Sequence, residues 1–111
     1  MFKECRLRKR ASFRYVYHNG TAVSGELMTL IFVKTKGVKV GVSVSKKIGK
    51  SVVRNLVKRR INENFMRLMP RLNGEYNYVV VAKPGIKEAG FHEIGSALDA
   101  LLNKAGHLKN V

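Results

Sequence analysis

The chain has 111 residues, of which 45% are hydrophobic, a composition that suits one folded domain and excludes a chain that is disordered throughout. It carries 22 Lys and Arg against 7 Asp and Glu, a formal net charge of +15, so its expected partners are polyanions. Nucleic acid is the first candidate. An anionic membrane surface is the second, although basic residues occur in every segment rather than on one amphipathic anchor.

The sequence gives no sign of export, membrane insertion or disulfide bonding. No apolar run approaches the roughly 20 residues that span a bilayer, and the N-terminal stretch lacks the apolar core of a signal peptide. Cys5 is the only cysteine, which excludes an internal disulfide and a cysteine metal cluster. These features predict a cytoplasmic protein.

The chain begins with a basic arm, residues 1–10. Its cations are Lys3, Arg6, Arg8, Lys9 and Arg10. We expect such an arm to be disordered alone and ordered on nucleic acid.

A short helix follows, with a predicted N-cap at Ser12 and an end at Asn19-Gly20, a pair that tolerates positive φ. Phe13, Val16 and Tyr17 share one face of this helix at i, i+3 and i+4. That face suits core packing and a ligand-facing role equally well. A short segment, 21–25, then turns into the first long strand.

Two strands are predicted over 27–35 and 38–45, separated by the tight turn Lys36-Gly37. In the second strand four valines alternate with small, polar or basic residues, which predicts one apolar face and one open face. Strands joined by so short a turn favour an antiparallel hairpin. The open face leaves room for something flat or extended to lie on it.

The stretch 43–60 organises the chain: it starts as a strand, turns through Gly49 and continues as a basic helix. Over 51–68 the helical period gathers an apolar arc that can pack on a sheet, namely Val53, Val57, Ile61 and Leu68 with Leu56 and Phe65 at its edges. The opposite arc is polar and contains Arg54, Asn55, Lys58, Arg59 and Asn62.

The polar arc has two interpretations. Charge runs on helices are usually solvated surfaces, and such surfaces commonly alternate in sign. Here Arg54 and Lys58 are like charges one turn apart, and Glu63 is the only acid between Lys46 and Pro70. We therefore favour a face that binds a polyanion, because guanidinium, amide and ammonium groups together suit phosphate and sugar oxygens.

The last elements are a strand over 76–82, buried on both faces, and a helix over 87–104, with a frayed tail at 105–111. The strands 38–45 and 76–82 flank the central helix, so they can be parallel neighbours joined by a helical crossover. The predicted order is helix, strands, helix, strand, helix. This order indicates a single two-layer α+β domain with helices mainly on one side of a small sheet.

The residues predict no catalytic or metal site. Asp99 is the only aspartate, the glutamates are scattered, and the three histidines lack metal-ligand spacing. The turn 47–51 superficially resembles a phosphate-binding loop, but Val44 stands where that loop requires its first glycine, five residues before Gly49. Binding rather than catalysis is the expected role.

Several segments resemble one family. The run 41–49 followed by 53–59 resembles the signature of the bacterial ribonuclease P protein subunit, Phe13-Arg14-Tyr15-Val16-Tyr17-His18-Asn19-Gly20 resembles its aromatic helix, and 77–83 resembles its late strand. The resemblance spans nearly the whole chain in the right order. It implies a four-stranded sheet with a left-handed βαβ crossover, against the usual right-handed rule.

The resemblance also implies a function. The ribonuclease P holoenzyme is an endoribonuclease that removes the 5′ leader of precursor tRNA by hydrolysing one phosphodiester with Mg²⁺, and its RNA subunit carries the catalytic site. Expected partners are therefore the catalytic RNA and precursor tRNA, with Mg²⁺ held mainly by RNA. No membrane and no obligate protein partner are expected.

Two sets of binding residues follow from the resemblance. Those expected to bind the RNA subunit are Lys46, Lys47, Lys50, Arg54, Asn55, Lys58, Arg59 and Arg60. Those expected in the cleft for the leader are Phe13, Tyr17, Thr29, Ile31, Ser43 and Ser45. The chain departs from the family pattern at Leu56 and Asn62, where basic residues are usual, and at Ile31, where an aromatic is common.

Two other classes of function compete with this one. A structural ribosomal or general RNA-binding protein would share the charge and the fold without a role in tRNA processing. A self-sufficient nuclease would need a cluster of carboxylates or histidines, which the sequence does not offer.

Overall fold

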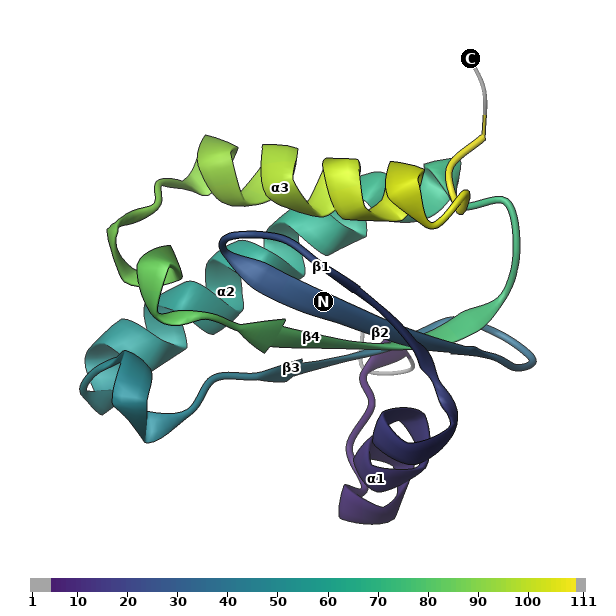
Figure 1. The fold of residues 1–111 in the computed structure, drawn as a ribbon, viewed down its shortest axis with the longest axis horizontal. Coiled ribbons are helices and arrows are strands. Elements are labelled where there is room, and N and C mark those ends of the chain that lie inside the picture. Colours follow the sequence, from purple (N-terminus) through teal and green to yellow (C-terminus); the bar gives the residue numbers. More distant parts are fainter. Residues whose placement is uncertain (1–4, 110–111) are drawn as a thin grey trace.

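The computed structural model describes residues 5–109, in which a four-stranded sheet lies between helices (Figure 1). The elements are α1 (Arg10–Asn19), β1 (Thr21–Ser24), β2 (Met28–Lys34), β3 (Lys39–Ser43), α2 (Ser51–Leu68), β4 (Tyr76–Ala82) and α3 (Phe91–Lys104). The short helices η2 (Lys46–Ile48), η3 (Met69–Arg71) and η4 (Pro84–Glu88) lie in the connections. The α+β class, the order of elements and the bounds of α2 and β4 are confirmed.

The strand order is β1-β2-β4-β3, with β3 and β4 parallel and the other two pairs antiparallel. The parallel pair joined through α2 is therefore confirmed, and its left-handed sense stays a prediction from the resemblance. The predicted antiparallel hairpin of β2 and β3 is wrong, because β4 lies between them. Tyr78, Val79 and Val80 have no exposed surface, and only a central strand buries both of its faces.

Helices cover the two faces of the sheet unequally (Figure 1). The main core lies between the sheet and the pair α2 and α3, and it includes Met28, Ile61, Phe65 and Leu98. A smaller cluster, Leu7, Val16, Ile31 and Val79, lies beneath α1 on the opposite face. The prediction of helices mainly on one side is thus confirmed. No helix of the described part is long and apolar enough to cross a bilayer.

Several predicted boundaries shift. The helix α1 begins at Arg10 with Lys9 as its N-cap, so Ser12 lies inside the first turn and its N–H donates to the Lys9 carbonyl at 3.0 Å. Gly20 is extended at φ −85°, and a Cβ there would lie 2.8 Å from the Phe32 carbonyl oxygen. Glycine is required at this position for close approach and not for positive φ.

The other shifts lie at strand and helix ends. The third strand stops at Ser43 rather than at residue 45, because the chain then leaves the sheet for η2. The last helix begins at Phe91 rather than at residue 87, because η4 takes up the preceding residues.

Both ends of the described chain pack against the domain. The N–H of Leu7 donates to the Val40 carbonyl at 3.0 Å, and Leu7 is buried. At the other end Leu108 is buried, and the Lys109 N–H donates to the Arg71 carbonyl at 2.7 Å. Apolar residues thus anchor the backbone at 5–9 and 105–109, and disorder of the free arm and fraying of the tail stay predictions. Residues 1–4 and 110–111 lie outside the described residues.

Candidate nucleic-acid interface

The polar arc of α2 is held outward by its buried opposite face. Val57, Ile61 and Leu68 pack into the main core, which turns the other side of the helix to solvent. Lys58 and Arg59 are exposed there, as predicted. The helix is anchored along its length, so the backbone that carries these cations is already ordered. Binding an anion therefore costs little further backbone entropy.

A hollow of about 340 Å³ lies along this arc, and we call it the helix hollow. Its lining residues are Arg6, Asn55, Lys58, Arg59, Asn62 and Glu63. Only one of these side chains is acidic, and Arg6 reaches the hollow from the N-terminal arm. The arrangement offers cations and amides to phosphate and sugar oxygens.

A second hollow, the strand hollow, has a volume of about 240 Å³ and adjoins β3. It shares Arg6, Lys58 and Asn62 with the helix hollow, and its wall includes Phe13 and Gly41. The Phe13 ring lies against Gly41, where an added Cβ would be only 2.7 Å from the ring Cε1. The absence of a side chain at Gly41 therefore lets the ring lie on the strand backbone.

The aromatic hollow runs along α1 and has a volume of about 290 Å³. It is lined by Arg10, Phe13, Arg14, Tyr17 and His18. Tyr17 keeps 44% of its surface exposed, whereas Val16 on the same helix has none exposed. The two interpretations of the aromatic face thus apply to different residues, since Val16 belongs to the core and Tyr17 faces solvent.

Two arginines predicted to bind RNA have partners within the chain. The half-buried Arg54 donates from Nε to the Gly49 carbonyl at 3.1 Å, which ties α2 to the turn before it. Arg60 donates from Nη1 to the Ala89 carbonyl at 3.0 Å and so connects α2 with the residue that follows η4. Helical periodicity alone gave no sign of either contact.

The lysines before α2 lie apart from the hollows. Lys46, Lys47 and Lys50 are exposed on η2 and the turn that follows it, and none of them lines the three hollows. They extend the basic surface at the start of the helix without forming a concave site.

Three of the predicted cleft residues lie on one face of the sheet. Thr29 of β2 and Ser43 of β3 both pair with Val81 of β4, and Ile31 pairs with Val79 on the same face. Ile31 is 9% exposed and packs beneath α1, so an incoming base cannot reach its side chain. The Thr29 hydroxyl shares a hydrogen bond of 3.1 Å with the Ser24 hydroxyl. Ser43 is half-buried at the end of β3, and Ser45 is exposed.

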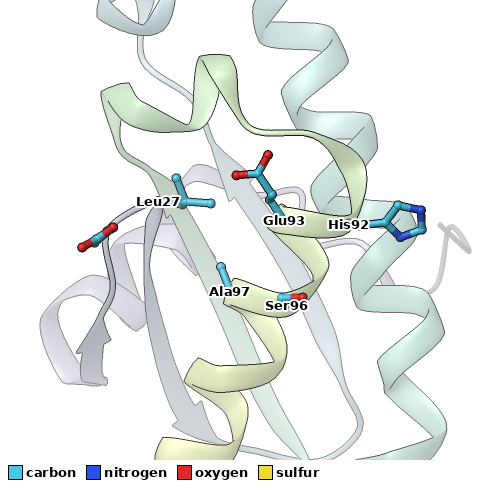
Figure 2. Close-up of a pocket in the computed structure, with 6 residues that line it drawn as sticks. Leu27, His92, Glu93, Ser96 and Ala97 are labelled. Atoms are coloured by element: carbon cyan, nitrogen blue, oxygen red, sulfur yellow. The ribbon is translucent and has the colours of Figure 1, made fainter.

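A larger hollow of about 470 Å³ lies between the β1–β2 connection and the start of α3 (Figure 2). Its lining includes Leu27, His92, Glu93 and Ala97, and the His92 ring points away from Leu27 and Ala97. The Glu93 carboxylate accepts the Gly90 N–H at 3.2 Å, a role in capping α3. No acid–base pair converges in this hollow, so the candidate site is the basic interface. Across residues 5–109 no three His, Cys, Asp or Glu side chains gather in a group suited to a metal ion.

Comparison with known proteins decides the family. Residues 1–106 match the profile of the family described as Ribonuclease P. The chain belongs to the ribonuclease P protein family. The ribonuclease P protein component of Clostridium perfringens is 41% identical over 109 residues, which cover 90% of this chain and 87% of that protein. That of Clostridium botulinum strain Langeland is 41% identical over 107 residues, covering 94% and 96%.

Solved ribonuclease P proteins share the fold. The Staphylococcus aureus protein superposes with a TM-score of 0.87 at 29% identity, covering 95% of this chain and 98% of that one. The Thermotoga maritima protein, in complex with 1-(4-fluorophenyl)-2-thiourea, gives 0.83 at 27% identity, covering 89% and 98%. As a member of this family the chain is the protein component of an endoribonuclease of tRNA processing, and it partners the RNA subunit of ribonuclease P.

The position of Arg6 in this ribonuclease P protein is not evident from its sequence. Arg6 lines both the helix hollow and the strand hollow, yet its segment reads only as a basic arm. Leu7, the one apolar residue between Arg6 and Arg10, is the available signal. Burial of Leu7 against β3 orients its neighbours along the interface.

Proposed function

We propose that this chain binds the catalytic RNA of ribonuclease P through the helix hollow and the 5′ leader of precursor tRNA along the strand and aromatic hollows. In this way it assists removal of the leader by the RNA subunit. The side chains of Lys58 and Arg59 contact the phosphates of the RNA backbone, which positions the RNA without reading its base sequence. Phe13 and Tyr17 offer aromatic surfaces on which leader bases can stack.

One observation carries the proposal: the surfaces for the two RNAs are continuous. Lys58 and Asn62 line both the helix hollow and the strand hollow, and Phe13 lines both the strand hollow and the aromatic hollow. An RNA on α2 and a single strand on α1 would therefore be held side by side on one rigid frame. Such a frame suits a subunit that joins a catalytic RNA to its substrate.

Magnesium enters the proposal as an ion held mainly by RNA. Among residues 5–109, no three His, Cys, Asp or Glu side chains are grouped so as to hold a metal ion. Mg²⁺ would activate and orient the hydrolytic step. The part assigned to this chain is to neutralise phosphate charge and hold both RNAs in position.

The first test is cleavage of precursor tRNA at low Mg²⁺. Catalytic RNA alone, RNA with protein and protein alone would be compared. We expect cleavage to be rescued only when RNA and protein are both present. Binding without rescue would favour a general RNA-binding protein, and cleavage by protein alone would favour a self-sufficient nuclease.

Variants separate the two surfaces. The double variant Lys58→Ala and Arg59→Ala should weaken binding of the catalytic RNA, with a shallower salt dependence. The double variant Phe13→Leu and Tyr17→Leu should reduce the preference for leader-bearing over mature tRNA. Lys87→Ala with Lys104→Ala removes the same charge from exposed positions outside the hollows and serves as the control. Equal loss of mature and precursor tRNA by the aromatic variant would contradict the leader assignment.

A further inference from the structure

A fourth basic hollow lies beyond the proposed RNA path, at the start of β3. Its volume is about 300 Å³, and we call it the arm hollow. Its polar lining comprises Arg6, Arg8, Lys9, Ser12, Lys39 and Asn77. Apart from Arg6, none of these residues lines the helix, strand or aromatic hollow. The arm hollow thus adds its own cations to the surface.

The cations of the arm hollow stand on fixed backbone. The Leu7 N–H donates a hydrogen bond to the Val40 carbonyl of β3. The Lys9 carbonyl accepts hydrogen bonds from the N–H groups of Ser12 and Phe13 in the first turn of α1. The segment that carries Arg6, Arg8 and Lys9 is therefore held at both ends. Lys39 faces it from β3, where its partner in the parallel register is Asn77 of β4.

No carboxylate of the described chain neutralises this cluster. The lining contains no Asp or Glu, and the one ion pair found within residues 5–109 is Arg71 with Asp99. The N-terminal turn of α1 adds to the positive potential, since it holds no acidic residue and no side chain caps it. Four like charges around one hollow repel one another until an anion enters.

Asn77 narrows the class of ligand that the arm hollow can bind. Its Oδ1 is buried and finds no hydrogen-bond partner within residues 5–109, and the residue lines the cationic hollow. Leaving a buried acceptor unpaired is unfavourable, so the site calls for a ligand that also brings a donor. A backbone phosphodiester has no donor of its own, whereas the ribose 2′-hydroxyl next to it does.

We propose that the arm hollow binds one backbone phosphate of RNA together with an adjacent 2′-hydroxyl. The phosphate lies among Arg6, Arg8 and Lys39, and the hydroxyl donates to Asn77 Oδ1. Arg6 links this subsite to the helix and strand hollows, so the RNA path continues along the edge of β3. The inference rests on the proposed function, because it takes RNA as the partner.

The test measures affinity for a short oligoribonucleotide and for the oligodeoxyribonucleotide of the same sequence, over a series of KCl concentrations. Arg8→Ala with Lys39→Ala should weaken RNA binding and reduce the salt slope by about 0.7 for each cation lost. Lys87→Ala with Lys104→Ala is the matched control and should leave the slope unchanged. Arg8 and Lys39 are exposed, so both double variants should fold. If the Arg8→Ala, Lys39→Ala variant and the control variant have the same RNA affinity and the same salt slope, the proposed subsite is refuted.

Asn77→Val tests the hydroxyl contact. Valine keeps a similar volume and suits a strand, but it has no acceptor. We expect the ratio of RNA to DNA affinity to fall while the salt slope stays the same. Equal weakening of RNA and DNA, or no weakening, would overturn the 2′-hydroxyl assignment.

The outcome for the arm hollow can be read apart from the proposed function. If the arm variants bind RNA like the control while Lys58→Ala with Arg59→Ala loses the catalytic RNA, the arm hollow is refuted and the proposed function stands. If the wild-type chain fails to rescue cleavage yet the arm variants weaken RNA binding, the subsite stands and the role in tRNA processing fails.

Discussion

Gly41 makes room for the Phe13 ring in the interface, because the ring lies directly against the Gly41 α-carbon. We expect Gly41→Ala to lower the free energy of unfolding by about 1–3 kcal/mol, since the new methyl group displaces the ring. The same displacement should reduce the preference for leader-bearing tRNA. Urea unfolding and binding of precursor and mature tRNA would measure the two effects.

Gly85→Ala is the matched control for this substitution. The nearest atom to an added Cβ there is Leu27 Cδ2 at 3.9 Å, an ordinary contact. Its free energy of unfolding should stay within about 0.5 kcal/mol of the wild type. If Gly41→Ala is as mild as Gly85→Ala, the ring does not depend on the bare backbone.

His107 makes stability depend on pH. Its Nδ1 shares a hydrogen bond of 2.8 Å with the Tyr78 hydroxyl, and its ring stacks on Tyr76 at 3.9 Å between centroids. Burial lowers the pKa of His107 below its ordinary value of 6.5, and burial, followed by the nearby Tyr76, raises the pKa of Tyr78, so both groups stay neutral at pH 7. The unfolded chain therefore binds the histidine proton more readily than the folded chain.

The stabilisation from neutral His107 is thus complete above about pH 6.5 and is lost as the pH falls through the lower pKa of the folded state. We expect His107→Gln to be less sensitive than the wild type to a change from about pH 7.5 to about pH 5.5. Urea unfolding at the two pH values measures the difference. An identical loss in both proteins would assign the pH dependence to other groups.

At the scale of elements, Asn64 joins α2 to α3. It has no exposed surface, donates from Nδ2 to the carbonyls of Arg60 at 2.8 Å and Phe91 at 3.0 Å, and accepts from Arg67 Nη2 at 3.2 Å. Its carboxamide also fits against Gly95, which explains a glycine in the middle of a helix. The contact sets the distance between the two helices.

We expect Asn64→Ala to lower the free energy of unfolding by about 1–3 kcal/mol, because the substitution removes the Nδ2 hydrogen bonds to the Arg60 and Phe91 carbonyls at a fully buried position. Asn103→Ala, at an exposed position of α3, should change it by no more than about 0.5 kcal/mol. Thermal and urea unfolding would compare them. A mild effect of Asn64→Ala would mean that these two hydrogen bonds contribute little to the stability of the domain.

Element bounds were predictable where a local pattern is strong. The helical period of 51–68 and the apolar run of 76–82 need no distant partner to be recognised, and both match the structure. The contacts of Asn64, Arg54 and Arg60 were not predictable, because their partners are backbone carbonyls that other segments supply. Periodicity predicts on which face of a helix a side chain lies, but it does not predict which residues that side chain contacts.

At the scale of the whole molecule, the net charge of +15 acts across a domain with extents of 34 × 34 × 24 Å. The Debye length is about 30 Å at 0.01 M salt and about 8 Å at 0.15 M. At low salt the charges therefore repel one another across the entire domain, and at physiological salt only near neighbours do so. Salt should accordingly stabilise the free protein.

We expect the free energy of unfolding to rise by on the order of 1 kcal/mol between about 0.01 M and about 0.15 M KCl. Urea unfolding at the two concentrations measures the change. Lys104→Glu lowers the net charge on an exposed site outside the hollows and should reduce the effect. A free energy that is independent of KCl would show that repulsion between the charges does not limit stability.

The amino-acid sequence alone was enough to predict the α+β class, the order of the elements, the bounds of the central helix and its polar arc. These depend on local periodicity and on composition, which each segment carries alone. The folded structure was needed to show that β4 separates β2 from β3, that Leu7 and Leu108 anchor the ends, and that Arg6 lines three hollows at once. The physical reason is that burial on both faces, pairing of backbone groups and convergence of charges are relations between distant segments.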